Sequence, residues 1–504
     1  MSTSSTQPPS RKEKSPSDRP NLLFVFTDEQ RADTLNDDGP GPTLPNLRQL
    51  RDQSCWMEET YCTQPVCTPS RSSMMTGLYP HATGAYGNNK RLREEVPCLP
   101  ELLSPEARRD YATGYFGKWH LGDEVFAQHG FDTWVSIEDE YHKHNRPGRD
   151  PEARSNYHQF LLDQGFKPDK KNGLFSRDRS STLPEPFGKP AFLANEVTQW
   201  IEGQGAKPWI AYVNFLEPHM PFFGPRTAPH EPGELPPGYD VIPSPKDCLD
   251  LRLRSERFFQ RGFEWYNLQT EEGWRRMAAA YWGLCELIDY HTGRILKSLE
   301  ASGQADNTII VFTSDHGEMM GSHRCLAKGV MQQDSVRVPC LIRLPGQKKG
   351  QRVTGPFSQI DLVPTLLELL NQEVPDHLHG CSRAPILGGD AVHLNEDVLI
   401  QWNGNPPEER TVDEETPEFL NDIAGSPERV QAATQQNTRT LITADGWRWS
   451  RNPELEDHEL FHLAEDPLER SNLAQDPSQS DRIRSLDERL NAAMLKVDDP
   501  GKPV

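Results

Sequence analysis

The sequence predicts an α/β protein built on a large, mostly parallel β-sheet flanked by helices, with a smaller α+β lobe at its C-terminal end. From about residue 21, apolar runs typical of buried strands alternate with helical patterns, which favours a parallel sheet. From about residue 390 the chain is acidic and carries short strand-like pieces before a polar helical segment. We therefore expect a main domain over 21–389, a lobe over 390–504 and a disordered tail over 1–20.

The composition limits the partners and the compartment. The formal net charge of the 504 residues is -21, which argues against a nucleic-acid or anionic-membrane partner. No apolar run is long enough to cross a bilayer, and the first twenty residues lack the apolar core of a signal peptide. Nine scattered cysteines, without CxxC pairs, are typical of a reducing compartment. We therefore expect a cytoplasmic protein with no membrane partner.

Four predicted strands are each followed by polar residues that can do chemistry. In chain order, the four sets are Asp28 and Glu29, Lys118 and His120, Glu217 and His219, and Asp315 and His316. Ligands of open parallel sheets bind beyond the carboxyl ends of the strands. One polar strand end is common in any sheet, but four that together supply acids, histidines and a lysine indicate a functional site.

The acids at two of these ends can hold a metal ion, and the basic residues can hold an anion. Asp28, Glu29, Asp315 and His316 are mainly hard oxygen ligands, which suit Ca²⁺ or Mg²⁺. A lone Asp more often caps a helix or turn, so the prediction depends on two acidic pairs together. The cationic candidates are Arg71, Lys118, His120, His219 and Lys328. Fixed cations of this kind stabilise a tetrahedral oxyanion, and a lysine or histidine can protonate a leaving oxygen. Taken singly, each is more often a surface charge or a structural histidine.

A cysteine precedes a stretch that is built to start a helix, in PVCTPSRSS (65–73). Thr68 is a good N-cap and Pro69 fits the first helical position. Cys67 would then lie beside the free N–H groups of a helix N-terminus, which favour negative charge. A small buried structural thiol is the simpler alternative for this fragment alone.

Several motifs together resemble one family. CTPSRSSMMTG (67–77) matches the signature C-x-P-S-R-x-x-x-x-T-G at every fixed position, and YATGYFGKWHLG (111–122) contains the second signature core, G-K-W-H-L-G. The segments that follow in the family order are TDEQRADTL (27–35), EPHMPF (217–222), TSDHGE (313–318), Lys328 and SVRVPCLIRLPG (335–346). On these residues the sequence, from about 21 to 475, resembles the formylglycine-dependent (type I) sulfatases of the alkaline phosphatase superfamily.

The resemblance implies an alkaline-phosphatase-like fold and a covalent mechanism. A separate formylglycine-generating enzyme would oxidise Cys67 to Cα-formylglycine, an aldehyde. Its hydrate would attack the sulfur of a sulfate ester, and its second hydroxyl would let the sulfated intermediate release sulfate. The resemblance also implies one divalent metal, Ca²⁺ first, with Mg²⁺ or Mn²⁺ as alternatives.

The resemblance assigns roles to the residues by position. The implied metal ligands are Asp28, Glu29, Cys67, Asp315 and His316. The other implied roles are Arg71 as the residue that holds the formylglycine, His120 as the base for sulfate release, Lys118 as the sulfate contact, and His219 with Lys328 as the pair that binds sulfate and assists the leaving group.

The sequence departs from the family pattern at three places. Glu29 occupies a place where the family usually has Asp, Gln or Asn. His316 stands where many members have Asn, and VMQQDSVRVP (330–339) lacks the Tyr-Glu-Glu that often precedes SVRVP.

The leading hypothesis is a sulfuric ester hydrolase that acts on a sulfated carbohydrate or a small organic sulfate. The alternative is a phosphonate monoester or phosphodiester hydrolase on the same scaffold, because the signatures are shared. A hypothesis from another class is a non-catalytic protein in which Cys67 remains a thiol. Segments 140–181 and 221–245 are expected to be loops that either shape substrate access or form a solvated surface, with basic residues such as His142, His144 and Arg146 available for a polyanionic sugar.

Overall fold

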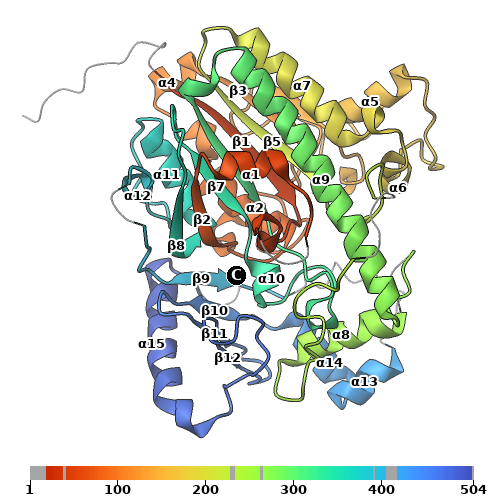
Figure 1. The fold of residues 1–504 in the computed structure, drawn as a ribbon, viewed down its shortest axis with the longest axis vertical. Coiled ribbons are helices and arrows are strands. Elements are labelled where there is room, and N and C mark those ends of the chain that lie inside the picture. The colour runs from red at the N-terminus through yellow and green to blue at the C-terminus, as the bar shows by residue number, and fades with distance from the viewer. Residues whose placement is uncertain are drawn as a thin grey trace, which may run out of the picture.

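The computed structural model describes residues 19–37, 41–227, 233–261, 265–389, 392–404 and 417–501, and Figure 1 shows its path. All but the last two residues of the predicted N-terminal tail lie outside the described residues. Among the described helices, none combines the length and the apolar character that a bilayer crossing requires.

Eight strands form the main sheet in the order β4-β3-β5-β1-β6-β7-β2-β8. The strands are β1 (Asn21–Asp28), β2 (Cys55–Tyr61), β3 (Ala112–Gly117), β4 (Thr133–Ser136), β5 (Trp209–Pro218), β6 (Thr308–Ser314), β7 (Cys340–Arg343) and β8 (Gln351–Ser358). Within the described sheet, β7 is the strand that runs antiparallel to its neighbours, and all other pairs are parallel. The predicted large, mostly parallel sheet is confirmed.

The four strands with polar ends are neighbours at the centre of the sheet. The order β3-β5-β1-β6 is part of the main sheet, and Leu22 of β1 is level with both Ile210 of β5 and Ile309 of β6. Because all four strands are parallel, their carboxyl ends lie along one edge. This order is what brings the predicted functional residues together.

Helices cover both faces of the sheet. Along β1, Leu23 and Val25 pack into one core, whereas Leu22, Phe24 and Phe26 pack into the other. The first core is completed by α1 (Pro45–Arg51), α5 (Asn156–Asp163), α7 (Lys189–Gln204) and α9 (Glu271–Ala301), and Figure 1 shows α9 running along the sheet beside α7. The second core is completed by α2 (Cys67–Thr76), α4 (Pro105–Asp110), α11 (Leu362–Leu369) and α12 (Ala384–Leu387). Strands that are buried on both faces have continuous apolar sequences, which is why these strands could be predicted from the sequence.

The C-terminal part forms a separate antiparallel sheet in the order β12-β11-β10-β9. Its strands are β9 (Val398–Gln401), β10 (Arg439–Ile442), β11 (Trp447–Arg451) and β12 (Glu459–His462), and α15 (Ser480–Lys496) follows them. Leu486, Leu490 and Met494 of α15 pack on this sheet, and Figure 1 shows the helix alongside it. The smaller α+β unit is therefore present, while its boundary at residue 390, which is outside the described residues, stays a prediction.

Segment 140–181 is not the continuous loop that the sequence led us to expect. It contains α5 and α6 (Arg177–Ser181) as well as a short 3-10 turn over His142–His144. The side chains of Ser155 and Ser176 accept hydrogen bonds from backbone N–H groups of the first turns of these helices, and such caps stabilise short helices among polar residues. In segment 221–245, residues 221–227 and 233–245 form no helix or strand. The remaining helices are α3 (Pro80–Thr83), α8 (Leu249–Arg261), α10 (Gln333–Val336), α13 (Glu418–Ala424) and α14 (Pro427–Gln435).

Candidate active site

Helix α2 begins at Cys67 itself. Its N-cap is Val66 in an extended conformation, so the prediction of Thr68 as N-cap and Pro69 as the first helical residue was wrong. The Thr68 hydroxyl instead donates to the backbone carbonyl of His120, at 2.9 Å. All ten residues of α2 are buried, and the helix ends at Gly77 with φ 72°. Cys67 is thereby fixed at the first turn of a buried helix.

Four of the predicted metal ligands lie together at the strand ends. The ligand atoms of Asp28, Cys67, Asp315 and His316 all lie within 4.8 Å of one another, and all four residues are buried. The Cys67 thiol is 3.5 Å from Asp28 Oδ1 and 3.2 Å from His316 Nε2. His316 Nδ1 lies 2.9 Å from the carbonyl of Gly317, which places the proton on Nδ1 and leaves the Nε2 lone pair toward the carboxylates.

Arg71 joins the two carboxylates of this group. Its Nη2 is 2.8 Å from Asp28 Oδ2 and its Nε is 2.8 Å from Asp315 Oδ2. Its Nη1 donates to the carbonyl of Lys118 at 2.6 Å and to Asn214 Oδ1 at 2.9 Å. The planar guanidinium has five donors in a fixed fork, and here it spans β1, β6, β3 and β5. Arg71 therefore fixes the orientation of two predicted ligands at once.

Cations control the charge of the centre. Burial alone would raise the pKa of Asp28, but Lys118, His219 and Arg71 hold this pKa well below its ordinary value. Lys118 Nζ is 2.6 Å from Asp28 Oδ2, and this carboxylate raises the pKa of Lys118 despite burial. Burial and the charge of Asp28 raise the pKa of the Cys67 thiol to about 12. The unmodified cysteine is therefore a neutral thiol beside an ionised carboxylate.

Glu29 forms a second group with Asp28 and His219, whose ligand atoms also lie within 4.8 Å of one another. Its Oε1 is 2.9 Å from Lys328 Nζ, and its Oε2 is 3.4 Å from His219 Nε2. Burial and the nearby Glu318 carboxylate raise the pKa of Glu29 well above its ordinary value, although Lys328 opposes the shift. The three predicted residues Glu29, His219 and Lys328 therefore meet at one side of the centre.

His120 lies against the segment that follows β4. Its Nε2 is 2.8 Å from Asn89 Oδ1, and its ring lies 4.1 Å from the ring of Tyr141. Burial, followed by the charges of Lys118 and Arg71, lowers the pKa of His120 well below its ordinary value. The imidazole is neutral at pH 7, which is the state of a general base.

The structure adds residues that sequence reasoning missed. Asn214 is buried in β5, where its Oδ1 accepts from Arg71 and its Nδ2 donates to the carbonyl of Phe26. Asn214 could have been predicted from the sequence, because it is a polar residue inside an otherwise apolar strand. The Tyr141 ring lies 5.6 Å from Lys118 Nζ as well as against His120, and nothing in its local sequence indicates this position.

The residues of the first group fit a divalent cation. Asp28 and Asp315 provide carboxylate oxygens and His316 an available imidazole nitrogen, while the oxygens of the buried Glu29 contact Lys328 and His219. Buried carboxylates so close together are costly unless a cation compensates them. This oxygen-rich donor set suits Ca²⁺, Mg²⁺ or Mn²⁺ better than a metal that prefers thiolates.

Comparison with known proteins agrees with this chemistry. Residues 20–372 match the family model described as Sulfatase. An ulvan-active sulfatase from Formosa agariphila is 27% identical over 499 residues, covering 96% of this chain and 83% of that protein. A choline-sulfatase from Rhizobium meliloti is 27% identical over 490 residues, covering 91% of this chain and 83% of that protein. Among solved structures, a phosphonate monoester hydrolase from Silicibacter pomeroyi shares the fold, with TM-score 0.76, 22% identity and 96% of both chains covered. This chain belongs to the sulfatase family, within the alkaline phosphatase superfamily, and is a hydrolase of sulfate esters.

Proposed function

We propose that the chain hydrolyses its sulfate ester at position 67, after Cys67 has been converted to Cα-formylglycine. The observation that carries this proposal is the position of the thiol, 3.5 Å from Asp28 Oδ1 and 3.2 Å from His316 Nε2 at the N-terminus of a buried helix. Hydrated formylglycine would supply the nucleophilic hydroxyl and a second hydroxyl for release. A separate formylglycine-generating enzyme is the maturation partner that this chemistry requires.

Asp28, Asp315, His316 and residue 67 would hold a divalent metal, for which Ca²⁺ is the first candidate and Mg²⁺ or Mn²⁺ the alternatives. Glu29, which shares a group with Asp28, would complete the site. When bound, the ion would supply positive charge that polarises oxygen atoms beside it. Arg71 would keep both aspartates aimed at the ion.

The basic residues would bind the sulfate group and move protons. Lys118 and Lys328 are near the carboxylates from β3 and the segment after β6, so they surround the anion with positive charge. Burial lowers the pKa of His219, which follows β5, well below its ordinary value, so this residue would contact the sulfate as a neutral imidazole. Lys328, which lies with His219 beside Glu29, would protonate the leaving alcohol, because its ammonium carries a proton to give. The neutral His120 would accept the proton whose removal releases sulfate.

Conversion of Cys67 is tested by mass. The tryptic peptide that ends at Arg71 should be lighter by about eighteen daltons than the unmodified peptide, the difference between a thiol side chain and an aldehyde. Cys67→Ala should lower hydrolysis of 4-nitrophenyl sulfate at least about a thousandfold and leave the circular dichroism spectrum unchanged. An unmodified peptide in a fully active enzyme, or a Cys67→Ala variant with normal activity, would contradict the proposal.

The substrate is proposed to be a sulfated carbohydrate or a small organic sulfate, as the names of the ulvan-active and choline sulfatases suggest. The phosphonate monoester or phosphodiester activity remains the second candidate. The favouring observations are the fold shared with the phosphonate monoester hydrolase and the 27% identity to a multifunctional superfamily protein from Trinickia caryophylli. Parallel assays on an aryl sulfate and an aryl phosphonate monoester rank the two: a higher kcat/KM on the phosphonate would reverse the order.

We further propose a reducing, cytoplasmic location. All nine cysteines lie in the described part of the chain and none forms a disulfide, as expected where thiols stay reduced. Fractionation of the native host, with the protein found outside the cytoplasm, would contradict this location.

A further inference from the structure

A positively charged groove opens beside the candidate active site. This cavity of about 580 Å³ is lined by Gly84, Tyr86, Asn89, Lys90, Arg91, Lys143, His144, Asn145 and Pro147. Its lining has three full positive charges, one histidine and no carboxylate, in a chain whose formal net charge is -21. We call this cavity the basic groove.

Two contacts connect the basic groove to the catalytic side. Asn89, which lines it, holds His120 Nε2 at 2.8 Å through its Oδ1. The ring of His144 lies 6.4 Å from the ring of Tyr141, which in turn lies 4.1 Å from the ring of His120. The inner end of the groove is therefore one side chain away from the proposed base.

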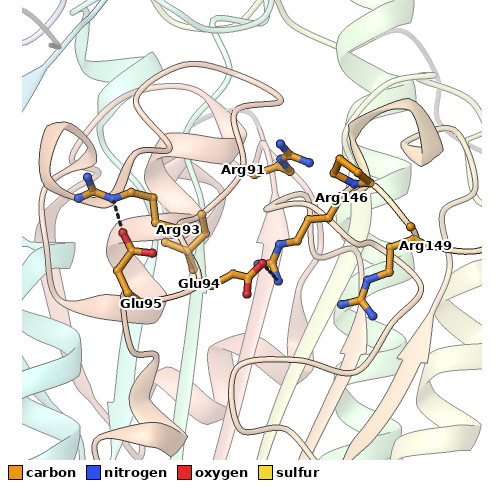
Figure 2. A pocket seen from close by; sticks show the side chains of 9 residues that line it. Arg91, Arg93, Glu94, Glu95, Arg146 and Arg149 are labelled. Atoms are coloured by element: carbon orange, nitrogen blue, oxygen red, sulfur yellow. Dashed lines mark ion pairs between the residues drawn. The ribbon is translucent and has the colours of Figure 1, made fainter.

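A second cavity, of about 730 Å³, extends the groove and shares Arg91 and Pro147 with it. Figure 2 shows Arg91, Arg146 and Arg149 on one side of this cavity and Arg93 with Glu95 on the other. The buried Asp123 holds Arg149 in place, because its carboxylate accepts a hydrogen bond from Arg149 Nε at 2.9 Å. The same carboxylate accepts from the backbone N–H of Arg146 at 2.8 Å. The arginines are therefore held in place before any ligand arrives.

The free charge of this surface lies at Arg91 and Lys143. Both are exposed, and Arg91 donates to the backbone carbonyl of Asn145 at 3.1 Å, which orients its guanidinium without neutralising it. Arg146 and Arg93, by contrast, have Glu94 and Glu95 as partners at 2.8 and 3.6 Å. Among the described residues, no carboxylate forms an ion pair with Arg91 or Lys143. Positive side chains oriented in a concave surface attract an anion more strongly than isolated surface charges.

We propose that the basic groove binds a second anionic group of the substrate, a sulfate or a carboxylate, while the scissile sulfate lies at residue 67. The substrate is then a polyanionic saccharide rather than a small monoanionic sulfate. Two adjacent cavities of about 580 and 730 Å³, the first lined by the Asn89 that contacts His120, suit a ligand that extends beyond one sugar unit. This inference rests on the proposed function for its catalytic part, but the groove itself is tested by binding alone.

The binding test uses the double variant Arg91→Glu/Lys143→Glu, because neither side chain belongs to the catalytic machinery. The probe is a fully sulfated heparin tetrasaccharide, titrated by calorimetry at low and moderate salt. We expect wild-type binding that weakens with salt and at least about tenfold weaker binding by the variant, since two exposed charges are reversed. The matched control is Lys348→Glu. Lys348 is exposed, pairs with Asp306 and lies in the segment between β7 and β8. This variant should bind like the wild type. Equal affinity of wild type and double variant would overturn the proposal.

The turnover test separates this inference from the proposed function. On 4-nitrophenyl sulfate, the double variant should keep kcat/KM within about twofold, because the substrate has no second anion to place in the groove. On a disaccharide with a second anionic group, kcat/KM should fall about tenfold, mainly through KM. Parallel disaccharides with a second sulfate or a uronate carboxylate show which anion the groove takes. If the wild type had no sulfatase activity, the proposed function would be rejected, and the binding test alone would decide whether the groove binds an anion. If the double variant lost activity equally on all substrates, the proposed role of the groove would be rejected.

Discussion

At the scale of single residues, the centre is a set of buried charges that balance one another. Arg71, Asp28 and Asp315 are all almost fully buried, and Arg71 contacts both carboxylates at 2.8 Å. Taking such charges out of water is costly, and the cost is offset only while every partner is present. The geometry of the site and the stability of the fold therefore depend on the same contacts.

Substitution of Arg71 should reveal this dependence. We expect Arg71→Lys to lower the free energy of unfolding of the metal-free protein by about 3–5 kcal/mol, because an ammonium cannot reproduce the forked contacts with two carboxylates. Urea unfolding of metal-free protein is the measurement. Arg276→Lys is the control, since Arg276 pairs with Glu272 on an exposed face of α9 and should change stability by less than about 0.5 kcal/mol. Equal effects of the two substitutions would contradict the account.

At the scale of elements, the contact between the end of β3 and the middle of β5 positions Lys118 and Asn214. Gly117, the last residue of β3, has φ 124°, and a Cβ at this position would lie 2.0 Å from the backbone oxygen of Asn214. A glycine is required here because the strands approach too closely for a side chain. The next residue is Lys118, whose ammonium contacts Asp28, so the close approach determines where a predicted sulfate contact lies.

Gly117→Ala should separate these strands. We expect the free energy of unfolding to fall by at least about 2 kcal/mol, and sulfate ester hydrolysis to fall at least about tenfold because Lys118 and Asn214 move. The control is Gly173→Ala, where φ is +76° but nothing lies within 4 Å of the added Cβ. This control should cost only the left-handed backbone strain, about 1 kcal/mol. A Gly117→Ala variant as active and as stable as the control would disprove the argument.

At the scale of the whole molecule, a bound ion would connect the sheet and helix α2. The candidate ligands come from the end of β1, from the start of α2 and from the segment after β6. An ion that binds only the folded state stabilises the whole domain by mass action. The metal is therefore expected to affect stability as well as activity.

Removal of metal should lower both quantities. We expect a chelator to abolish hydrolysis, and Ca²⁺ at a hundredfold excess over its Kd to raise the free energy of unfolding by about 2.7 kcal/mol. Asp315→Asn should lose this Ca²⁺-dependent gain, whereas Asp361→Asn, a buried aspartate that pairs with Arg383 outside the site, should retain it. Calorimetric scans with and without Ca²⁺ provide the measurement. Unchanged stability of the wild type on adding Ca²⁺, Mg²⁺ and Mn²⁺ in turn would reject a metal at this centre.

Buried histidines should make the fold sensitive to acid. Burial lowers the pKa of His323 from 6.5 to about 4, although Glu459 opposes the shift. Above pH 6.5 the imidazole is neutral in both states. Between pH 6.5 and 4 the unfolded chain takes up the proton and the folded chain does not, so the free energy of unfolding falls as the pH is lowered through this window, by up to about 3 kcal/mol for this residue.

Urea unfolding at pH 7.5, 6 and 5 should show a smaller loss of stability for His323→Gln than for the wild type. His377→Gln, at an exposed position, is the control and should follow the wild type. A wild-type pH dependence in the His323 variant would contradict this assignment.

The strands, their polar ends and the family could be predicted from the sequence alone. The apolar runs of β1, β5 and β6 were readable because a strand buried on both faces leaves a continuous local pattern. Asp28, Asp315 and His316 were found for the same reason, since they lie at the end of such a strand or just after it. Cys67 was found through the motif that follows it. The roles of these residues stay proposals, and the fold that holds them is confirmed.

Which residues meet could be learned only from the three-dimensional structure. The start of α2 at Cys67, the helices within 140–181, the contact of Asn89 with His120 and the place of Tyr141 were not readable from the chain. Arg71 and Asn214 are 143 residues apart, and their 2.9 Å contact exists because the sheet places β5 beside β1. Local patterns report burial and backbone preference, whereas contacts of this length depend on strand order and on the packing of side chains from distant segments.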